Sequence, residues 1–584
     1  MQYDANGRLF QTIDHEAGIT HTYEYDSLDR LIRAWQKNTS NGSVILGVEN
    51  AYDSYGRAKG STVITGGKKL AYTITYDEDT NLVSSVRLPT TSPDSAYNYD
   101  YDNFDRVITE QISLSTLRDY YTDYTYQTYT DDEGNVFTSN LVSTLILRVS
   151  SGGTTTAETY GYTYDNVGNI TAVTKNGSTI RSYVYDSLNR LQRENDHESL
   201  TYYVYSYDNA GNILSKVKKT WIGTPLSTTT YGYSTSGWKD LLTNYNGTTI
   251  TYDAIGNPLK WRNATSMTWD KRALQSMTLS DGTAVSFQHN ADGIRTQKTV
   301  GSTTHSYVLD GTNIQSETVT GASNYTLYYI YDVSGSVIGF LYNNLPYYFQ
   351  KNLQGDVIRI LNATGTIVTE YKYDAWGNIL SITGTQADTI GQYNPFRYRG
   401  YYYDTETGFY YLNSRYYDPQ AGRFINADGI IGANGGIMGY NMFAYCSNNP
   451  VMFVDPLGAE FQEALAWGTS MGWLIIADGP LPIGDIAYWI GVAAFSLTCA
   501  SVASEALPEV DIYFDTHCDE LDIDTNVYEK SEEIEEPDPY ARPGQKKQGR
   551  ERKTKARKNP DWKPRSNPKP PKKHTPGRGH RKYK

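Results

Sequence analysis

The sequence has few of the residues that build disulfide frameworks or histidine-based metal sites. Its 584 residues include only three cysteines, Cys446, Cys499 and Cys518, which are odd in number and widely separated. No C-x-x-C pair occurs, so a disulfide framework and a paired-cysteine metal site are excluded. The eight histidines form no H-x-x-H or H-N-H motif. We therefore assign no metal and no cofactor.

A secretory signal is also missing. The first residues, "MQYDANGRLF", have no basic stretch followed by an apolar run. They open inside one of the repeat units described next. We therefore expect this chain to lack the N-terminal part of a longer protein.

Tyrosine is the abundant residue. The chain contains 54 Tyr against 14 Phe, together with 50 Gly, and 20% of its residues are charged. This composition is typical of Tyr-rich strands separated by glycine turns. A chain of this length is too long for one core and should form several domains or a repeat array.

A short Tyr-Asp unit recurs along the first two thirds of the chain. Its copies include "YEYDSLDRL" (23–31), "DYDNFDRVI" (100–108), "YTYDNVGNI" (162–170), "YSYDNAGNI" (205–213) and "YKYDAWGNI" (371–379). Tyrosines two positions apart lie on one face of a strand, and Asp followed by Asn, Gly or Asp favours a tight turn. Each unit is therefore predicted to be a β-hairpin that must stack on its neighbours to bury a face. A helix is excluded because the apolar period is two.

This repeat resembles the YD-repeat (RHS-repeat) family of bacterial RHS proteins, the C component of insecticidal toxin complexes and teneurins. The resemblance covers residues 1–385 and implies that the hairpins spiral into a hollow β-shell. The expected fold class is mainly β: a hairpin shell, complete or incomplete, then a hydrophobic helical linker and a small basic C-terminal domain. A generic Tyr-rich β-solenoid or adhesin stalk is the alternative.

Residues 386–458 form a second segment. The stretches "RYRGYYYDTETGFYYLNSRYYDPQAGRFINAD" and "YNMFAYCSNNPVMFVDPLG" resemble the RHS-associated core. In that family the core plugs and closes the shell, and a variable C-terminal domain, usually a toxin, follows the "DPxG" motif. The resemblance places the boundary of the core at Gly458.

Some members of the family cut themselves just after this motif, using aspartates that the core brings together. By position these are Asp428, in "NADG", and Asp455, in "DPLG". Two carboxylates that share a proton can serve as acid and base in peptide hydrolysis. The sequence departs from the family pattern, since "ADGI" replaces the first "DPxG" and Ala459 replaces Leu. The alternative is that both aspartates cap turns.

The composition changes after Gly458. Residues 459–504 are rich in Ala, Gly and Ile, and 486–504 are 19 consecutive uncharged positions, close to the length of a membrane span. The interruption "DGPLPIGD" (478–485) favours two short helices over one span. Three interpretations remain: a linker buried in the shell, a segment that makes transient membrane contact during delivery, and a pore-forming effector.

The C-terminal region, 505–584, combines an acidic and a basic block. Residues 505–539 carry 14 acids and one Lys, whereas residues 540–584 carry 18 Lys and Arg against two acids. The whole chain nevertheless has a formal net charge of −13. A basic, Pro-rich arm with scattered aromatic residues suits a polyanion such as nucleic acid.

The final stretch, "KKHTPGRGHRK", contains two of the eight histidines, His574 and His580. Cleavage of RNA requires a base, an acid and cations near the phosphate, and two histidines can supply the first two. We therefore predict a nuclease, on RNA rather than DNA, with His574 and His580 as catalytic residues. The residues predicted to bind the substrate are Lys573, Arg578, Arg581, Lys582 and Trp562. The alternative is a polyanion-binding tail with incidental histidines.

The family resemblance implies a contact-dependent or secreted toxin of bacterial competition. It implies as partners a cognate immunity protein, the nucleic acid of the target cell and an export or delivery machinery. The expected location is secreted or cell-surface, with residues 505–584 delivered into a target cell. The alternative is a cell-surface β-repeat adhesion protein with a basic anchoring tail.

Overall fold

The structure is a computed structural model. It describes residues 1–15, 17–90, 95–115, 118–131, 133–151, 154–429, 440–458 and 462–463. The chain divides into two compact units, Met1–Pro508 and Glu509–Lys584, and all described residues belong to the first. The predictions for the apolar stretch and for the C-terminal region therefore lie outside the described residues.

The first sheet has 21 strands, and each pairs antiparallel with the next strand along the chain. The strands are β1 (Gln2–Tyr3), β2 (Leu9–Asp14), β3 (Ile19–Tyr25), β4 (Leu31–Asn38), β5 (Val44–Tyr52), β6 (Ala58–Thr65), β7 (Lys68–Tyr76), β8 (Val83–Arg87), β9 (Ala96–Tyr101), β10 (Val107–Ser115), β11 (Arg118–Thr130), β12 (Val136–Ser151), β13 (Thr154–Tyr164), β14 (Ile170–Lys175), β15 (Ser178–Tyr185), β16 (Leu191–Asp196), β17 (Thr201–Tyr207), β18 (Ile213–Thr220), β19 (Pro225–Tyr233), β20 (Leu242–Tyr245) and β21 (Thr248–Thr249). The predicted array of hairpins is confirmed.

A two-stranded sheet, β22 (Thr251–Tyr252) and β23 (Pro258–Lys260), precedes the second large sheet, which has twelve strands. Its strands are β24 (Ala264–Asp270), β25 (Ala273–Leu279), β26 (Ala284–His289), β27 (Arg295–Val300), β28 (Thr303–Asp310), β29 (Asn313–Thr320), β30 (Tyr325–Tyr331), β31 (Val337–Tyr342), β32 (Leu345–Lys351), β33 (Val357–Leu361), β34 (Ile367–Tyr373) and β35 (Ile379–Thr383). These strands are also joined in chain order.

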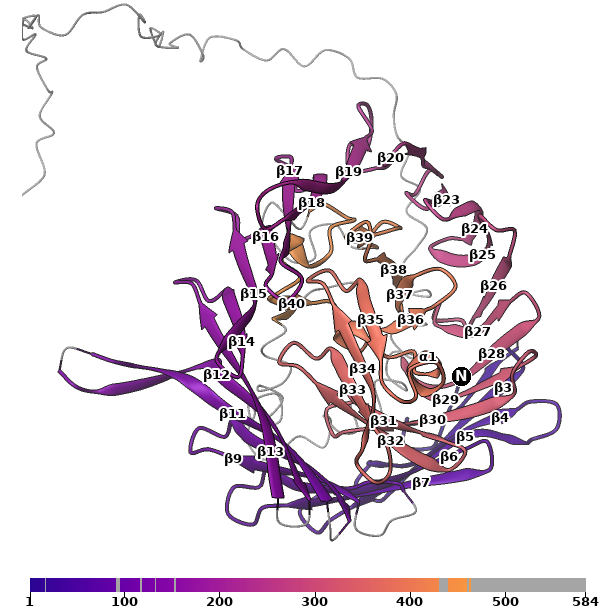
Figure 1. The fold of residues 1–584 in the computed structure, drawn as a ribbon. Helices are drawn as coiled ribbons and strands as arrows, with labels where there is room; N and C mark the ends of the chain where they lie inside the picture. Colours follow the sequence, from indigo (N-terminus) through magenta and orange to yellow (C-terminus); the bar gives the residue numbers. More distant parts are fainter. Residues whose placement is uncertain are drawn as a thin grey trace, which may run out of the picture. The chain divides into compact units, whose positions relative to one another are not determined.

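The remaining elements form the core module, residues 386–458. They are α1 (Ile390–Tyr393), η1 (Tyr398–Gly400), β36 (Tyr402–Asp404), β37 (Phe409–Leu412), β38 (Arg415–Asp418), β39 (Arg423–Phe424), η3 (Cys446–Asn448) and β40 (Phe453–Val454), which pairs with β41 (Gln462–Glu463). In Figure 1 the strands of this module, in orange, lie inside the curve that the purple strands of the first sheet follow.

The aspartate of each unit builds the turn that the sequence predicts. Asp53 Oδ1 accepts hydrogen bonds from the backbone amides of Tyr55 and Arg57, both at 2.9 Å. Asp53 Oδ2 accepts a further bond from the Arg57 side chain at 2.7 Å. Gly56 occupies the left-handed region with φ +88°, and Asp29 takes the same role with φ +61°. Short polar residues and glycine tolerate this conformation, which explains why they alternate at that position.

A tyrosine in most units joins its unit to the preceding one. Tyr25 donates its hydroxyl to the backbone oxygen of Leu9 at 2.9 Å, and Tyr207 donates to that of Leu191 at 2.6 Å. The equivalent bond is made by Tyr52, Tyr76, Tyr101, Tyr126, Tyr164, Tyr185, Tyr233, Tyr331 and Tyr373. Phenylalanine has no hydroxyl to donate, and this explains why these positions hold tyrosine.

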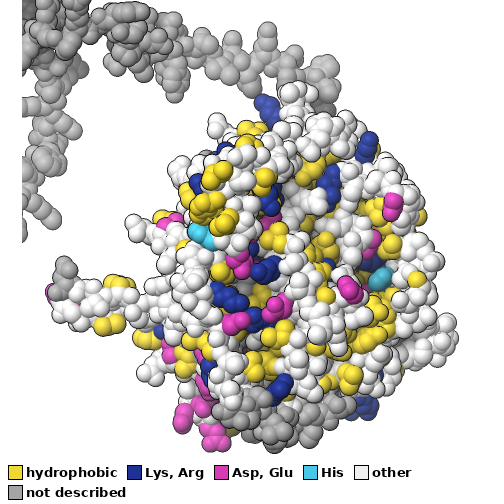
Figure 2. Space-filling view, in the orientation of Figure 1, with side chains coloured by type: hydrophobic (Ala, Val, Ile, Leu, Met, Phe, Trp, Pro, Cys, Tyr) yellow, Lys and Arg dark blue, Asp and Glu magenta, His cyan; other side chains and the backbone are white. Residues whose placement is uncertain are grey.

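Both large sheets and the core module share one hydrophobic cluster. It includes Leu145 of the first sheet, Phe340 of the second and Tyr417 of the core module. The Trp376 ring, in the turn after β34, lies 5.6 Å from the Tyr205 ring of β17. On the face shown in Figure 2, charged side chains of both signs gather around a hollow between apolar patches. The described residues of the first unit therefore form the predicted β-shell, and the core module packs against its inner side.

Candidate functional site

Only two of the predicted site residues, Asp428 and Asp455, lie within the part of the chain that the structure describes. The predicted catalytic histidines, His574 and His580, lie outside it, as do all five predicted substrate-binding residues. Among the described residues, no helix combines the length and apolar character that a membrane crossing requires. No group of three or more His, Cys, Asp or Glu side chains in the described ranges is arranged to hold a metal ion.

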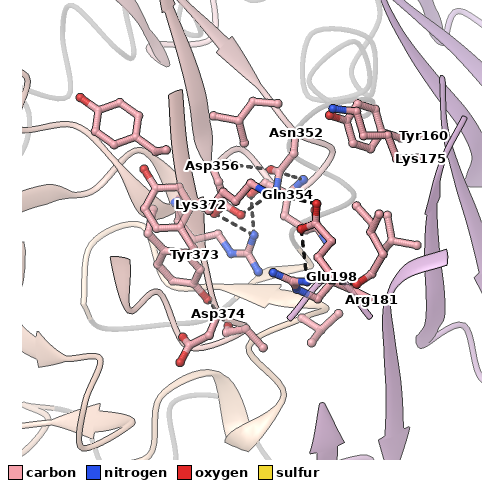
Figure 3. Close-up of a pocket in the computed structure, with 18 of the residues that line it drawn as sticks. Tyr160, Lys175, Arg181, Glu198, Asn352, Gln354, Asp356, Lys372, Tyr373 and Asp374 are labelled. Carbon is pink, nitrogen blue, oxygen red and sulfur yellow. Dashed lines mark hydrogen bonds and ion pairs between the residues drawn. The ribbon is translucent and has the colours of Figure 1, made fainter. Parts of the chain in front are cut away.

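A cavity of about 200 Å³ lies between the two large sheets (Figure 3). Its wall includes Arg181 from the first sheet, Asp374 from the second, and Arg399 from the core module. Ion pairs cross from sheet to sheet beside it: Arg359 Nη2 lies 2.7 Å from Glu158 Oε2, and Lys372 lies 3.1 Å from Glu198. Neither Asp428 nor Asp455 lines this cavity.

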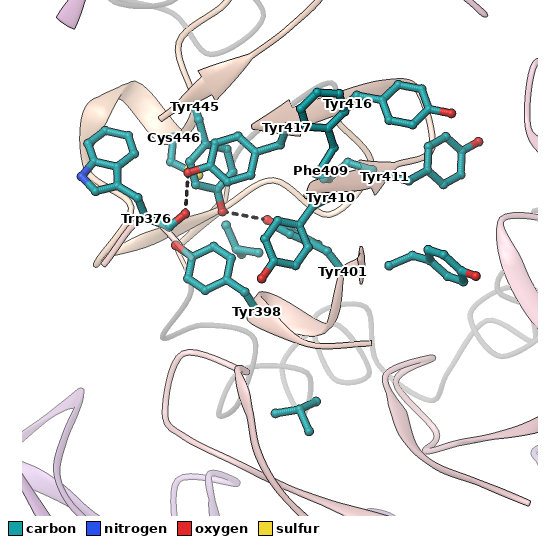
Figure 4. Close-up of a cluster of buried hydrophobic side chains, with 14 of the residues drawn as sticks. Trp376, Tyr398, Tyr401, Phe409, Tyr410, Tyr411, Tyr416, Tyr417, Tyr445 and Cys446 are labelled. Carbon is teal, nitrogen blue, oxygen red and sulfur yellow. Dashed lines mark hydrogen bonds between the residues drawn. The ribbon is translucent and has the colours of Figure 1, made fainter. Parts of the chain in front are cut away.

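Tyrosines form the interior of the core module (Figure 4). The rings of Tyr417 and Tyr445 stack with centroids 4.0 Å apart, and the hydroxyls of Tyr401 and Tyr445 lie 3.1 Å apart. Tyr417 donates its hydroxyl to the backbone oxygen of Trp376 at 2.7 Å. This cluster joins the module to a turn of the second sheet and fixes the backbone around the two aspartates.

Arg415 joins the two predicted aspartates. Its Nη2 atom lies 2.9 Å from Asp428 Oδ2 and 3.0 Å from Asp455 Oδ2. All three residues are buried, with 4%, 7% and 2% of their surfaces exposed. Asp428 and Asp455 are 27 positions apart in the sequence, and the core module brings both carboxylates to the guanidinium of Arg415.

The same arginine binds the backbone at the end of the "DPLG" motif. Arg415 Nε donates to the Gly458 carbonyl oxygen, and the Ser414 hydroxyl lies 2.6 Å from that oxygen. The Ser414 hydroxyl also lies 2.8 Å from the carbonyl oxygen of Leu457. Two donors therefore converge on the Gly458 carbonyl, three positions after Asp455.

Glycine is required at position 458 by the local geometry. Its φ is +72°, and an added Cβ would lie 2.7 Å from the backbone oxygen of Leu412 and 2.9 Å from the Ser414 hydroxyl oxygen. The close approach of this backbone to β37 and β38 is thus possible only without a side chain.

Burial shapes the electrostatics of this site. Removal from water lowers the pKa of the Arg415 guanidinium, although the negative charges of Asp455 and Asp428 act in the opposite direction. Burial, and then the charge of Asp455, raises the pKa of the Cys446 thiol well above its ordinary value. The backbone amide of Asp455 donates to the Tyr401 hydroxyl at 2.8 Å, which orients this aspartate.

The arrangement contains the groups that peptide hydrolysis uses. Carboxylates can transfer protons to and from water and an amide nitrogen, while positioned donors stabilise the negative charge that develops on a carbonyl oxygen. The sequence predicted the aspartates but not Arg415 or Ser414. One signal was available: Arg415 stands in the aromatic run "RYY", and a buried guanidinium requires an opposite charge.

Comparisons with known proteins agree with this architecture. The teneurin YD-shell family model matches residues 321–451. The crystal structure of TcdB2-TccC3 without its hypervariable C-terminal region aligns over 78% of this chain, with a TM-score of 0.51 and 17% sequence identity. The chain therefore resembles YD-repeat (RHS) proteins, over residues 321–451 in sequence and over its shell in fold. It spans 27% of that solved chain, and at this level of identity the likeness concerns the fold of the YD-repeat shell.

Several curated relatives carry names that state an activity, among them a nuclease and a deaminase. The tRNA3(Ser)-specific nuclease WapA of Bacillus spizizenii is 38% identical over 221 residues, which are 37% of this YD-repeat chain and 9% of the nuclease. Double-stranded DNA deaminase toxin A of Burkholderia cenocepacia is 37% identical over 120 residues, 20% of this chain and 8% of the toxin. The chain thus spans about a tenth of the length of these relatives.

Proposed function

We propose that this chain carries a C-terminal toxin and cuts its own backbone directly after Gly458. The observation that carries the proposal is the convergence of Asp428, Asp455 and the Gly458 carbonyl on Arg415. Cleavage there separates the shell and core, residues 1–458, from a linker, 459–504, and a payload, 505–584.

The chemistry is an ordinary peptide hydrolysis. One carboxylate takes a proton from a water molecule as the water oxygen attacks the Gly458 carbonyl carbon. Arg415 and Ser414 hydrogen-bond to the oxygen that becomes negatively charged. The same carboxyl group then returns this proton to the amide nitrogen of Ala459. The carbon–nitrogen bond breaks, which leaves a carboxyl group on Gly458 and an amino group on Ala459.

A denaturing gel of the purified full-length chain tests the cleavage. The intact chain has a mass of 65.7 kDa, and we expect two fragments whose new N-terminus is Ala459. Asp428→Asn and Asp455→Asn should each leave the chain intact, while Asp29→Asn, an exposed aspartate of an early turn, should not. A single intact band from the unaltered protein contradicts the proposal.

The payload is proposed to be a nuclease that acts on RNA. Support comes from the basic segment 540–584, from the pair His574 and His580, and from the nuclease activity named in the WapA relative. The deaminase relative is named for a different activity, on double-stranded DNA. We propose a cognate immunity protein as partner, and secretion or display at the cell surface before delivery.

Expression of the full chain in bacteria tests the payload separately from the cleavage. We expect growth arrest with degraded RNA, relieved by His574→Ala or His580→Ala but not by His15→Ala in the shell. Degraded DNA with intact RNA would identify a DNase. A harmless chain that binds polyanions would favour the adhesion alternative.

A further inference from the structure

A buried glutamate of the first sheet contacts a turn of the second. Glu194, on β16, is 2% exposed, and its Oε1 accepts the backbone amide hydrogen of Ala375 at 2.9 Å. Its other oxygen, Oε2, has no hydrogen-bond partner among the described residues. Ala375 follows Asp374, the aspartate that begins the Tyr-Asp turn between β34 and β35. A carboxylate of one sheet therefore faces the turn carboxylate of the other.

A second buried glutamate of the first sheet is influenced by a turn carboxylate of the second sheet. Glu110, on β10, accepts a hydrogen bond from the Tyr124 hydroxyl at 3.0 Å, and the charge of Asp332 acts on it directly. Asp332 begins the Tyr-Asp turn between β30 and β31, and its neighbour Val333 packs into a cluster that contains residues of both sheets. Two turns of the second sheet thus each place an aspartate beside a glutamate of the first.

Each pair of carboxylates has a lysine nearby. Lys216 Nζ lies 3.4 Å from Asp374 Oδ2, and Lys351, which bonds Ser336 at 2.6 Å, faces both Asp332 and Glu110. The other titratable groups that face Glu194 are Arg181, Tyr183, Tyr185, Tyr203 and Tyr205. Those that face Glu110 are Tyr97, Tyr99, Tyr101, Tyr124 and Tyr126.

The two glutamates hold protons more tightly than exposed ones. Burial and then the charge of Asp374 raise the pKa of Glu194 to about 7. Burial and then the charge of Asp332 raise the pKa of Glu110 to about 7. Burial also lowers the pKa of Lys351, so this lysine compensates the second pair incompletely.

We propose that these two contacts form a pH-dependent latch between the first and second sheets, closed in acid and weaker toward neutral pH. The contacted state holds an extra proton on each glutamate. When the turn separates, the glutamate meets water and its pKa returns to about 4.3. The contact between the sheets is therefore strongest below about pH 4.3, and it weakens as the pH rises to about 7.

The first of these contacts lies beside a cavity large enough to hold water. Arg181, Asp374 and Ala375, which surround Glu194, line the cavity between the sheets (Figure 3). Proton exchange at Glu194 thus does not require the shell to unfold. The latch is independent of the proposed function, because it concerns only how the two sheets hold each other.

Hydrogen exchange of the full chain, followed by mass spectrometry and corrected for the intrinsic pH dependence of exchange, tests the latch. We expect protection of the amides in turn 374–378 to fall by about tenfold per pH unit between pH 5 and 7, since one proton is released on separation. Glu194→Gln should abolish this slope in turn 374–378 and leave that of turn 332–336 unchanged. Glu198→Gln, at the same sheet-to-sheet boundary, should change neither slope.

Asp374→Asn provides a second variant. Asn290, Asn352 and Asn362 already begin equivalent turns in this chain, each accepting backbone hydrogen bonds through Oδ1, so the turn should form. Without the neighbouring charge, Glu194 should release its proton at lower pH, and protection should fall over a narrower range. Protection that does not change with pH in the unaltered chain, or an undiminished slope in Glu194→Gln, overturns the proposal.

Discussion

The hydroxyl of Tyr126 donates a hydrogen bond to the backbone oxygen of Val107 at 2.7 Å, across 19 positions of sequence. Arg106 lies over the same ring, with its guanidinium carbon 3.9 Å from the centroid. One tyrosine therefore holds two neighbouring hairpins through its hydroxyl and its ring face. Equivalent hydrogen bonds recur throughout the shell, so the contribution of this type of bond to stability can be measured at one position.

Tyr126→Phe should destabilise the shell by about 1 kcal/mol, because it deletes the hydrogen bond and leaves the buried Val107 oxygen without its donor. The free energy of unfolding in denaturant measures this loss. Tyr129→Phe, on the same strand with a side chain 62% exposed, should change stability by less than about 0.5 kcal/mol. Equal losses in the two variants would show that the hydroxyl bond does not join the hairpins.

Much of this shell could be predicted from its repeats. Asp53 and Gly56 act as the sequence indicates, because turn formation depends only on residues a few positions apart. The bond from Tyr25 to Leu9 could not be predicted, since the pattern shows which face a tyrosine occupies but not which backbone atom it reaches. From the sequence alone, Glu194 would be placed on the solvent-facing side of a strand. Its burial becomes apparent only when the turn that contains Ala375 is placed against it.

The candidate site could be predicted only in part. A family resemblance aligns Asp428 and Asp455 with known positions, whereas their meeting on Arg415 depends on how β38 packs against segments 13 and 40 residues further along. Spacing in the sequence carries no information on such contacts. The payload histidines remain a prediction.

Arg415→Met should cost about 3–5 kcal/mol, because it removes the shared counter-charge of two buried carboxylates. It should also abolish self-cleavage, since it removes a donor to the Gly458 carbonyl. The free energy of unfolding and the denaturing gel measure these two effects. Arg33→Met is the matched control: Arg33 and Glu24 are about half exposed, so the loss of that pair should cost less than about 1 kcal/mol.

Acid should weaken the attachment of the core module to the second sheet. Burial raises the pKa of Asp404, but the charges of Arg295 and Lys298 outweigh it, and the pKa is lowered. A carboxyl whose pKa is lowered in the folded state stabilises the fold at pH values above its pKa in the unfolded chain, which is about 3.9. This stabilisation is lost as the pH falls below that value. We therefore expect the free energy of unfolding to decrease between pH 4 and pH 2.5.

Asp404→Asn should reduce the steepness of that acid loss and also lower stability at pH 7, because Arg295 and Lys298 are 1% and 3% exposed and lose their common partner. Asp281→Asn, in an exposed turn of the same sheet, should leave stability at pH 7 within about 0.5 kcal/mol of the unaltered protein. An acid profile that is the same with and without Asp404 would contradict this account.

Gly458→Ala should impair both folding and cleavage. A left-handed φ costs an alanine about 1–2 kcal/mol, and the contact of its Cβ with the Leu412 oxygen adds to that cost. The backbone must then shift, so the Gly458 carbonyl should lose its alignment with Arg415 and Ser414. Gly247→Ala separates the two causes, because Gly247 has φ +87° with open space around it. We expect Gly247→Ala to lower stability only by the cost of the left-handed conformation, and to leave the cleaved fraction of the protein unchanged. If both variants cleave equally, the close approach of residue 458 to β37 and β38 is not what positions the bond.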